Sequence, residues 1–215
     1  MYLSRLILNP RSRQVQAEIA HPYEMHRTVL RAFAEDLSQT RERVLFRLDV
    51  HPRTGLPTLL VQSQTGPDWS HLAAGSYLLP PDLLPPGEVN PGVKEVELAF
   101  RPGQMLAFRL LANPTKRLGK QAGPDKGKRV GLYRPEEQLA WLHRKGEQHG
   151  FQVLTAIPTA QRRTDDHRRQ LKFLSVCFDG VLKVLEPERF LAAVHQGIGS
   201  GKAFGFGLLS LAPPR

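Results

Sequence analysis

The feature that most restricts how this chain can fold is an order of strands and helices that occurs twice along its 215 residues. In the first half, the spacing of apolar residues predicts a helix over residues 22–39, which Pro22 can begin because its missing N–H needs no partner there. Short alternating or apolar runs predict the strands of this half over residues 2–8, 43–49, 57–64 and 103–112.

The second half repeats this order after a connector over residues 113–130 that is rich in glycine and lysine and is expected to be a basic loop. Asp179-Gly180 is a strong hairpin-turn signal, and a highly charged segment over residues 161–169 precedes the strand that leads to it. The apolar patterns predict helices over residues 135–150 and 187–195, and strands over residues 151–157, 171–178, 181–185 and 205–211.

Two such halves predict an α+β fold of two tandem ferredoxin-like (RRM-like) domains with antiparallel sheets. We expect the N-terminal domain over residues 1–114 and the C-terminal domain, with the basic loops and a glycine-rich loop, over residues 115–215. The repeat is visible in the order of elements and not in residue identity.

The positive charge of the chain is concentrated in one third of the sequence. The net charge is +10, and residues 101–172 hold 16 Lys and Arg against 6 Asp and Glu, while the rest of the chain holds 14 of each. Twenty-one of the 30 basic residues are arginines, which form forked contacts with phosphate. A polyanion, most simply a nucleic acid, is therefore the expected partner.

A candidate for proton-transfer chemistry lies in the stretch His21-Pro-Tyr-Glu-Met-His-Arg27. Tyr23 and His26 are three residues apart, so both side chains point to one side of the first helical turn. A phenol and an imidazole at one helix entrance can serve the two ends of an acid–base reaction. The alternative is a core histidine, because His26 also falls in the apolar arc of this helix. The residue types leave both interpretations open.

Several other functions are disfavoured by the motifs. The loop Gln196–Gly207 holds five glycines and Lys202, but Ala203 stands where a nucleotide-binding P-loop needs Ser or Thr, so an NTPase is not expected. The eight histidines are scattered and there is no cysteine cluster, so we expect no metal and no other cofactor. Cys177 as the only cysteine, with no long apolar run, predicts a cytoplasmic protein without a membrane span.

Five separated motifs together resemble the CasE family, the CRISPR repeat-RNA endonucleases of type I-E systems. They are Asn9-Pro10 with Arg13, the stretch His21–Arg27, Asn113-Pro114 with Lys116-Arg117, Gly127–Val130, and the glycine-rich loop Gly197–Gly207. The resemblance implies two tandem ferredoxin-like domains that cut precursor CRISPR RNA once per repeat at the base of its hairpin, without metal. It also implies that the protein stays bound to the product with the other Cascade subunits, and we expect it to be a monomer when isolated.

On this resemblance Tyr23 and His26 are the catalytic pair for attack of a ribose 2′-OH on the adjacent phosphate. Arg27 and Arg31, four residues apart on the helix, could straddle phosphates or pair with Glu24 and Glu35. A catalytically silent RNA-binding or assembly subunit is the alternative function. The residues expected to bind RNA are Arg13, Arg27, Arg31, Lys116, Arg117, Lys128, Arg129, Arg162, Arg163 and Lys202.

Overall fold

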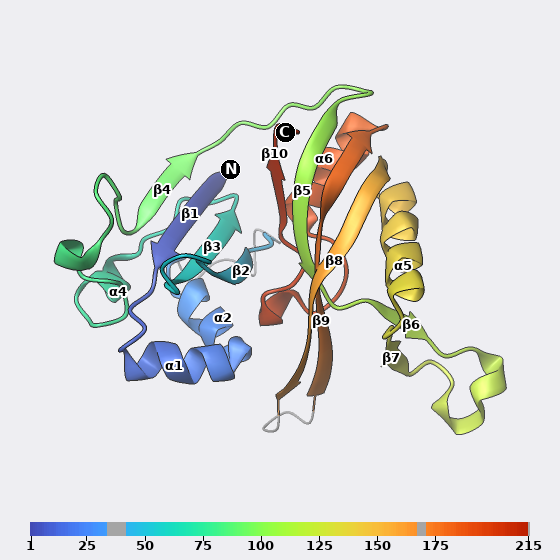
Figure 1. The fold of residues 1–215 in the computed structure, drawn as a ribbon, viewed down its shortest axis with the longest axis horizontal. Coiled ribbons are helices and arrows are strands. Elements are labelled where there is room, and N and C mark those ends of the chain that lie inside the picture. The colour runs from blue at the N-terminus through green and yellow to red at the C-terminus, as the bar shows by residue number, and fades with distance from the viewer. Residues whose placement is uncertain (34–41, 167–170, 215) are drawn as a thin grey trace. The chain divides into compact units, whose positions relative to one another are not determined.

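The computed structural model describes residues 1–33, 42–166 and 171–214 (Figure 1). The chain divides into two compact units. The first unit consists of Met1–Leu98 together with Lys202–Gly205, and the second consists of Ala99–Gly201 together with Phe206–Arg215.

The first unit is built on a four-stranded antiparallel sheet in the order β2-β3-β1-β4. Its strands are β1 (Tyr2–Ile7), β2 (Leu45–Val50), β3 (Pro57–Ser63) and β4 (Gly92–Glu95). Its helical segments are α1 (Arg13–Ala20), α2 (Pro22–Leu30), α4 (Ser70–Ala73) and the 3-10 turns η1 (Pro81–Leu83) and η3 (Lys202–Phe204).

The core of the first unit joins the sheet to α1 and α2. Leu6 of β1 and Phe46 of β2 are buried in one cluster with Met25 of α2 and Val15 of α1. Trp69 belongs to the same cluster, and its indole Nε1 donates to Ser4 Oγ over 3.1 Å. This apolar cluster fixes the face of α2 that packs on the sheet.

The second unit contains the same sheet topology, in the order β10-β5-β9-β8, again antiparallel throughout. Its strands are β5 (Met105–Ala112), β8 (Phe151–Asp166), β9 (Leu171–Val184) and β10 (Leu209–Ala212), and its helices are α5 (Pro135–Gln148) and α6 (Pro187–Gln196). A separate two-stranded hairpin is formed by β6 (Thr115–Arg117) and β7 (Arg129–Gly131), with the 3-10 turn η2 (Lys120–Asp125) between them.

The predicted pair of ferredoxin-like domains is confirmed, but the strand placed at the end of the first domain belongs to the second. β5 lies between β9 and β10, so it is the first strand of the second unit, and the units divide between residues 98 and 99 rather than at 114. The last strand of the first unit is β4, whose residues are largely exposed. A four-residue edge strand with so little buried apolar pattern carries no clear sequence signal.

The prediction of a hairpin turn at Asp179-Gly180 is wrong, because both residues lie inside the continuous strand β9. A Cβ on Gly180 would lie only 2.0 Å from the carbonyl oxygen of Thr155, next to an irregularity in the pairing of β8 with β9. Glycine is needed here for a close approach of two backbones, and not for a turn. The charged segment expected before β9 continues β8 as far as Asp166, and residues 167–170 lie outside the described part of the chain.

The first helical region also differs from expectation. α2 begins at Pro22 as predicted, but the described helix ends at Leu30, and residues 34–39 of the expected helix lie outside the described residues. Residues 13–20, for which no helix was expected, form α1, with Ser12 Oγ accepting from the backbone N–H of Val15. A Ser at this position is a favourable helix N-cap.

Candidate functional site

The candidate site is carried by the short helix α2, whose start is fixed by His21. The backbone N–H of His21 donates to the carbonyl oxygens of Ala17 and Glu18 and so closes α1, while its own carbonyl accepts from Glu24 N over 2.9 Å. One residue therefore ends α1 and begins α2. Because α2 starts at Pro22, Tyr23 lies in its first turn.

Tyr23 and His26 lie next to each other and are only partly buried. Their ring centroids are 5.7 Å apart and the ring planes meet at 61°, an edge-on arrangement. The next apolar residues of α2, Met25 and Val29, are each 1% exposed, whereas Tyr23 and His26 both retain intermediate exposure. His26 is therefore not a fully enclosed core histidine, and the two proton-transfer groups predicted from their spacing lie together.

Two phenylalanines complete the aromatic surroundings of this pair. The ring of Phe46 on β2 stacks on the imidazole of His26, with centroids 6.0 Å apart and 15° between the planes. Phe204 of η3 lies 5.7 Å from the Tyr23 ring at 45°. Neither phenylalanine was predicted from the sequence, where the only signal was the presence of Phe204 in the glycine-rich loop. Packing against these rings restricts the orientation of Tyr23 and His26.

The part of the glycine-rich loop that belongs to the first unit lies at this site. Gly205 has φ +83°, and a Cβ there would lie 3.2 Å from the Phe46 ring, so a glycine lets the loop approach β2 closely. Its N–H donates to the carbonyl of Lys202 over 3.1 Å. The structure thus brings Lys202, one of the predicted RNA-binding residues, into the segment that contacts Tyr23 through Phe204.

Burial sets the electrostatic state of His26. Its Nδ1 is buried and has no hydrogen-bond partner among the residues that the structure describes. Partial removal from water disfavours the charged imidazolium and lowers the pKa of His26 below 6.5. The imidazole is therefore neutral at pH 7 and able to accept a proton.

Three further predicted RNA-binding residues lie on or directly after the helices α1 and α2 of the first unit. Arg13 is the first residue of α1, Arg31 directly follows α2, and both are exposed. Arg27 forms an ion pair with Glu24 over 3.1 Å, as one of the two interpretations expected, yet 69% of its side chain stays exposed. An exposed pair of this kind is weak, so it leaves Arg27 able to exchange Glu24 for a phosphate.

Four predicted RNA-binding residues come together on the β6–β7 hairpin of the second unit. Lys116 pairs with Glu137 over 2.8 Å, and Lys128 pairs with Asp125. Arg117 stands directly opposite Arg129 across the two strands. Like charges in this position repel each other, so a bound anion would stabilise the hairpin.

The last two predicted RNA-binding residues, Arg162 and Arg163, belong to β8. Their backbone positions pair with Ser175 and Leu174 of β9.

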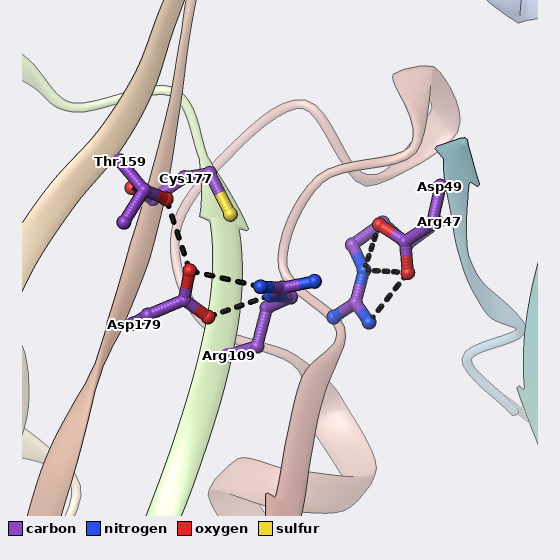
Figure 2. Close-up of polar contacts among 6 residues, drawn as sticks. All are labelled: Arg47, Asp49, Arg109, Thr159, Cys177 and Asp179. Carbon is purple, nitrogen blue, oxygen red and sulfur yellow. Dashed lines mark hydrogen bonds and ion pairs between the residues drawn. The ribbon is translucent and has the colours of Figure 1, made fainter. Parts of the chain in front are cut away.

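Other arginines are held in ion pairs that were not predicted (Figure 2). In the first unit, the guanidinium of Arg47 donates hydrogen bonds of 2.9 to 3.0 Å to both carboxylate oxygens of Asp49. The side chain of Arg47 is only 3% exposed. In the second unit, Arg109 donates to both carboxylate oxygens of Asp179, which also accepts from Thr159 Oγ1. Both arginines are held in place by a carboxylate on a neighbouring sheet position.

The described ranges contain no group of three or more His, Cys, Asp or Glu side chains placed to hold a metal ion. None of the helices formed by the described residues is both long and apolar enough to span a bilayer.

Comparison with known proteins decides the family. The family model described as CRISPR associated protein matches residues 1–213. The chain belongs to this family. Within the family it is 43% identical over 229 residues to the CRISPR-associated endoribonuclease Cse3 of Thermus thermophilus, covering 99% of this chain and 100% of that protein. It is 31% identical over 193 residues to the Cascade subunit CasE of Escherichia coli, covering 86% and 96% of the two chains. The resemblance to CasE is confirmed.

Solved structures of family members agree in fold. Thermus thermophilus Cse3 bound to an RNA representing a pre-cleavage complex has a TM-score of 0.84 and 41% sequence identity, covering 99% of this chain and 98% of that chain. Cas6e of Escherichia coli has a TM-score of 0.68 and 28% identity, with full coverage of both chains. These structures support the tandem ferredoxin-like assignment for this family member.

Proposed function

We propose that this protein is an endoribonuclease that binds the hairpin of CRISPR repeat RNA and cuts precursor CRISPR RNA. The observation that carries the proposal is the pairing of the partly exposed Tyr23 and His26 rings at the entrance of α2. This pairing occurs in a chain that is 43% identical, over its whole length, to a protein named as a CRISPR-associated endoribonuclease. The proposed cellular location is the cytoplasm.

The proposed reaction is attack of a ribose 2′-OH on the adjacent phosphate. A new 2′-O–P bond forms, the bond from phosphorus to the 5′ oxygen breaks, and the products are a 2′,3′-cyclic phosphate and a 5′-OH. We assign His26 as the base that takes the 2′-OH proton, because its lowered pKa keeps it neutral at pH 7. Tyr23 then gives its phenolic proton to the departing 5′ oxygen, and exchange with solvent afterwards removes the proton from His26 and restores the one on Tyr23.

The negative charge that develops on the phosphate requires nearby cations. Arg27 follows His26 directly on α2, and Lys202 belongs to the η3 segment that packs against Tyr23. We assign these two residues to stabilising the charge at the reacting phosphate. No step of the proposed reaction needs a metal ion.

Affinity for the RNA is assigned to phosphate contacts, because side chains cannot read the narrow major groove of A-form RNA. The exposed cations of the β6–β7 hairpin are suited to this role, and Arg117 and Arg129 occupy directly opposed positions on its two strands. The remaining proposed phosphate-binding residues are Arg13, Arg31, Arg162 and Arg163. Persistent binding of the cut RNA would let the protein remain with it as a Cascade subunit.

The test uses the cognate repeat hairpin in buffer containing EDTA. The proposal predicts a single cut that leaves a 2′,3′-cyclic phosphate and a 5′-OH, and no cut when the nucleotide upstream of the scissile phosphate carries a 2′-deoxy sugar. Intact RNA under conditions where the protein binds it would instead favour the alternative, a non-catalytic RNA-binding or assembly subunit. Cleavage of the 2′-deoxy RNA would contradict the 2′-OH mechanism.

A further inference from the structure

A buried carboxylate lies beneath the helix that carries the candidate catalytic pair. Glu18 of α1 is only 5% exposed, yet its two oxygens accept three hydrogen bonds. Oε1 accepts from Gln14 Nε2 over 2.8 Å and from Thr28 Oγ1 over 2.7 Å, while Oε2 accepts from the hydroxyl of Tyr77 over 2.6 Å. The carboxylate therefore joins α1, α2 and the segment around Tyr77.

Hydrogen-bond donors compensate for the burial of this carboxylate. None of the ion pairs found in the described part of the chain involves Glu18. Burial, followed by the hydrogen bond and charge of Glu18, raises the pKa of the Tyr77 phenol far above its usual value, so the phenol keeps its proton and donates it. A buried carboxylate is costly and tolerated only when its oxygens are satisfied, so the arrangement of its donors is closely specified.

The link to α2 is made at a position that controls the rotation of this helix. Thr28 follows His26 by two residues, or about 200° around the helix axis, so the two side chains lie on nearly opposite sides. α2 has only nine residues, and no side chain caps its N-terminus. The apolar contacts of Met25 and Val29 hold α2 on the sheet, but such contacts specify rotation less sharply than a directed hydrogen bond.

We propose that Glu18 is a positioning residue that holds α2, through Thr28, in the rotation that directs Tyr23 and His26 into one site. This inference rests on the proposed function, since it takes these two residues as the catalytic pair. Glu18 itself is buried and acts through Thr28 rather than on the RNA. His71 Nε2 lies 3.2 Å from the backbone carbonyl of Thr28 and adds a second constraint on the same turn.

The first test compares Glu18→Leu with Glu18→Gln. Single-turnover cleavage is measured at saturating protein, and affinity is measured separately with the uncleavable 2′-deoxy hairpin. Glu18→Leu is expected to slow cleavage about 100-fold, the effect of a displacement of roughly 1 Å at a reacting group, while affinity for the RNA is unchanged. Glu18→Gln keeps an acceptor for Thr28 and is expected to restore most of the rate.

A second readout needs no cleavage. Because the His26 imidazole stacks on Phe46, the NMR shifts of its ring protons report its position relative to that ring. Glu18→Leu is expected to move these shifts, and Glu18→Gln to leave them near the wild-type values. If wild-type protein binds the RNA without cutting it, the proposed function fails while these shifts still test the role of Glu18.

Thr28 provides a matched pair of variants that keeps the test independent of folding problems at Glu18. Thr28→Val removes the hydroxyl without changing the shape of the side chain, and Thr28→Ser retains the hydroxyl. The valine variant is expected to reproduce the slow cleavage and the shift changes, and the serine variant to resemble wild type. A folded Glu18→Leu or Thr28→Val protein with wild-type cleavage and wild-type His26 shifts would overturn the proposal.

Discussion

The imidazole of His26 lies nearly parallel to the ring of Phe46, with centroids 6.0 Å apart and 15° between the planes. Phe46 is 1% exposed and belongs to the core of the first unit, so a core side chain directly supports the orientation of the proposed base. Gly205 approaches the same phenylalanine ring from the glycine-rich loop. One ring thus connects the sheet, α2 and the glycine-rich loop.

Replacing Phe46 with leucine is expected to impair cleavage more than stability. The substitution costs about 1 kcal/mol of unfolding free energy, since it is a change between apolar residues of moderately different volume. It is expected to slow single-turnover cleavage roughly 10-fold, because the imidazole loses its stacking support. Phe190→Leu, in the fully buried core of the second unit, is the matched control that should lose similar stability and retain the wild-type cleavage rate.

The pH dependence of cleavage follows from the pKa of His26. Burial lowers this pKa below 6.5, and the base must be neutral to accept a proton. The cleavage rate should therefore rise with pH, with a midpoint below pH 6.5, and level off at higher pH. The same shift affects stability. The folded state binds a proton less readily than the unfolded state, so stability is full above pH 6.5 and declines as pH falls through the folded-state pKa. A rate that instead falls as pH rises through this region would assign His26 as the acid.

The β6–β7 hairpin is expected to supply phosphate contacts to RNA. Arg129→Ala should weaken binding of the repeat hairpin and reduce the magnitude of the slope of log K against log salt concentration by about 1, because one phosphate contact is lost. Titrations at several salt concentrations measure this slope. Arg53, an exposed arginine outside the proposed RNA-binding set, provides the control Arg53→Ala, for which an unchanged slope is expected.

Gly180 is expected to be indispensable for the second sheet. An alanine Cβ there would lie 2.0 Å from the backbone oxygen of Thr155, so Gly180→Ala should lower the free energy of unfolding by about 3 kcal/mol or prevent folding. Urea unfolding measures the loss. Gly119→Ala is the control, because a Cβ on Gly119 meets nothing within 4 Å, and its stability should match wild type. Equal stability of the two variants would contradict the close approach at Gly180.

The parts of the fold that could be predicted from the sequence are those with strong local signals. Pro22 marks the start of α2 because proline is favoured at the first helical position, and long apolar patterns marked α5 and α6. β4 was missed because its exposed residues show little apolar pattern. At Gly180, local turn chemistry gave the wrong answer because a tertiary contact with Thr155 determines the need for glycine.

The same distinction applies to the candidate site. The proximity of Tyr23 and His26 could be predicted, because residues three apart on a helix share a side. Phe46 and Phe204 could not, because they come from a distant strand and a distant loop that meet α2 only through the tertiary fold. The network of Glu18 was also invisible, since a glutamate in a short amphipathic helix is ordinarily exposed.

The central claim, that the imidazole of His26 performs the chemistry, is tested most directly by comparing wild-type and His26→Ala protein on the same repeat hairpin in EDTA. Single-turnover cleavage and affinity for the 2′-deoxy hairpin are measured side by side. We expect the alanine variant to bind with wild-type affinity and to cut at least about 100-fold more slowly, the lower range for loss of a general base. Cleavage by His26→Ala at the wild-type rate would contradict the account.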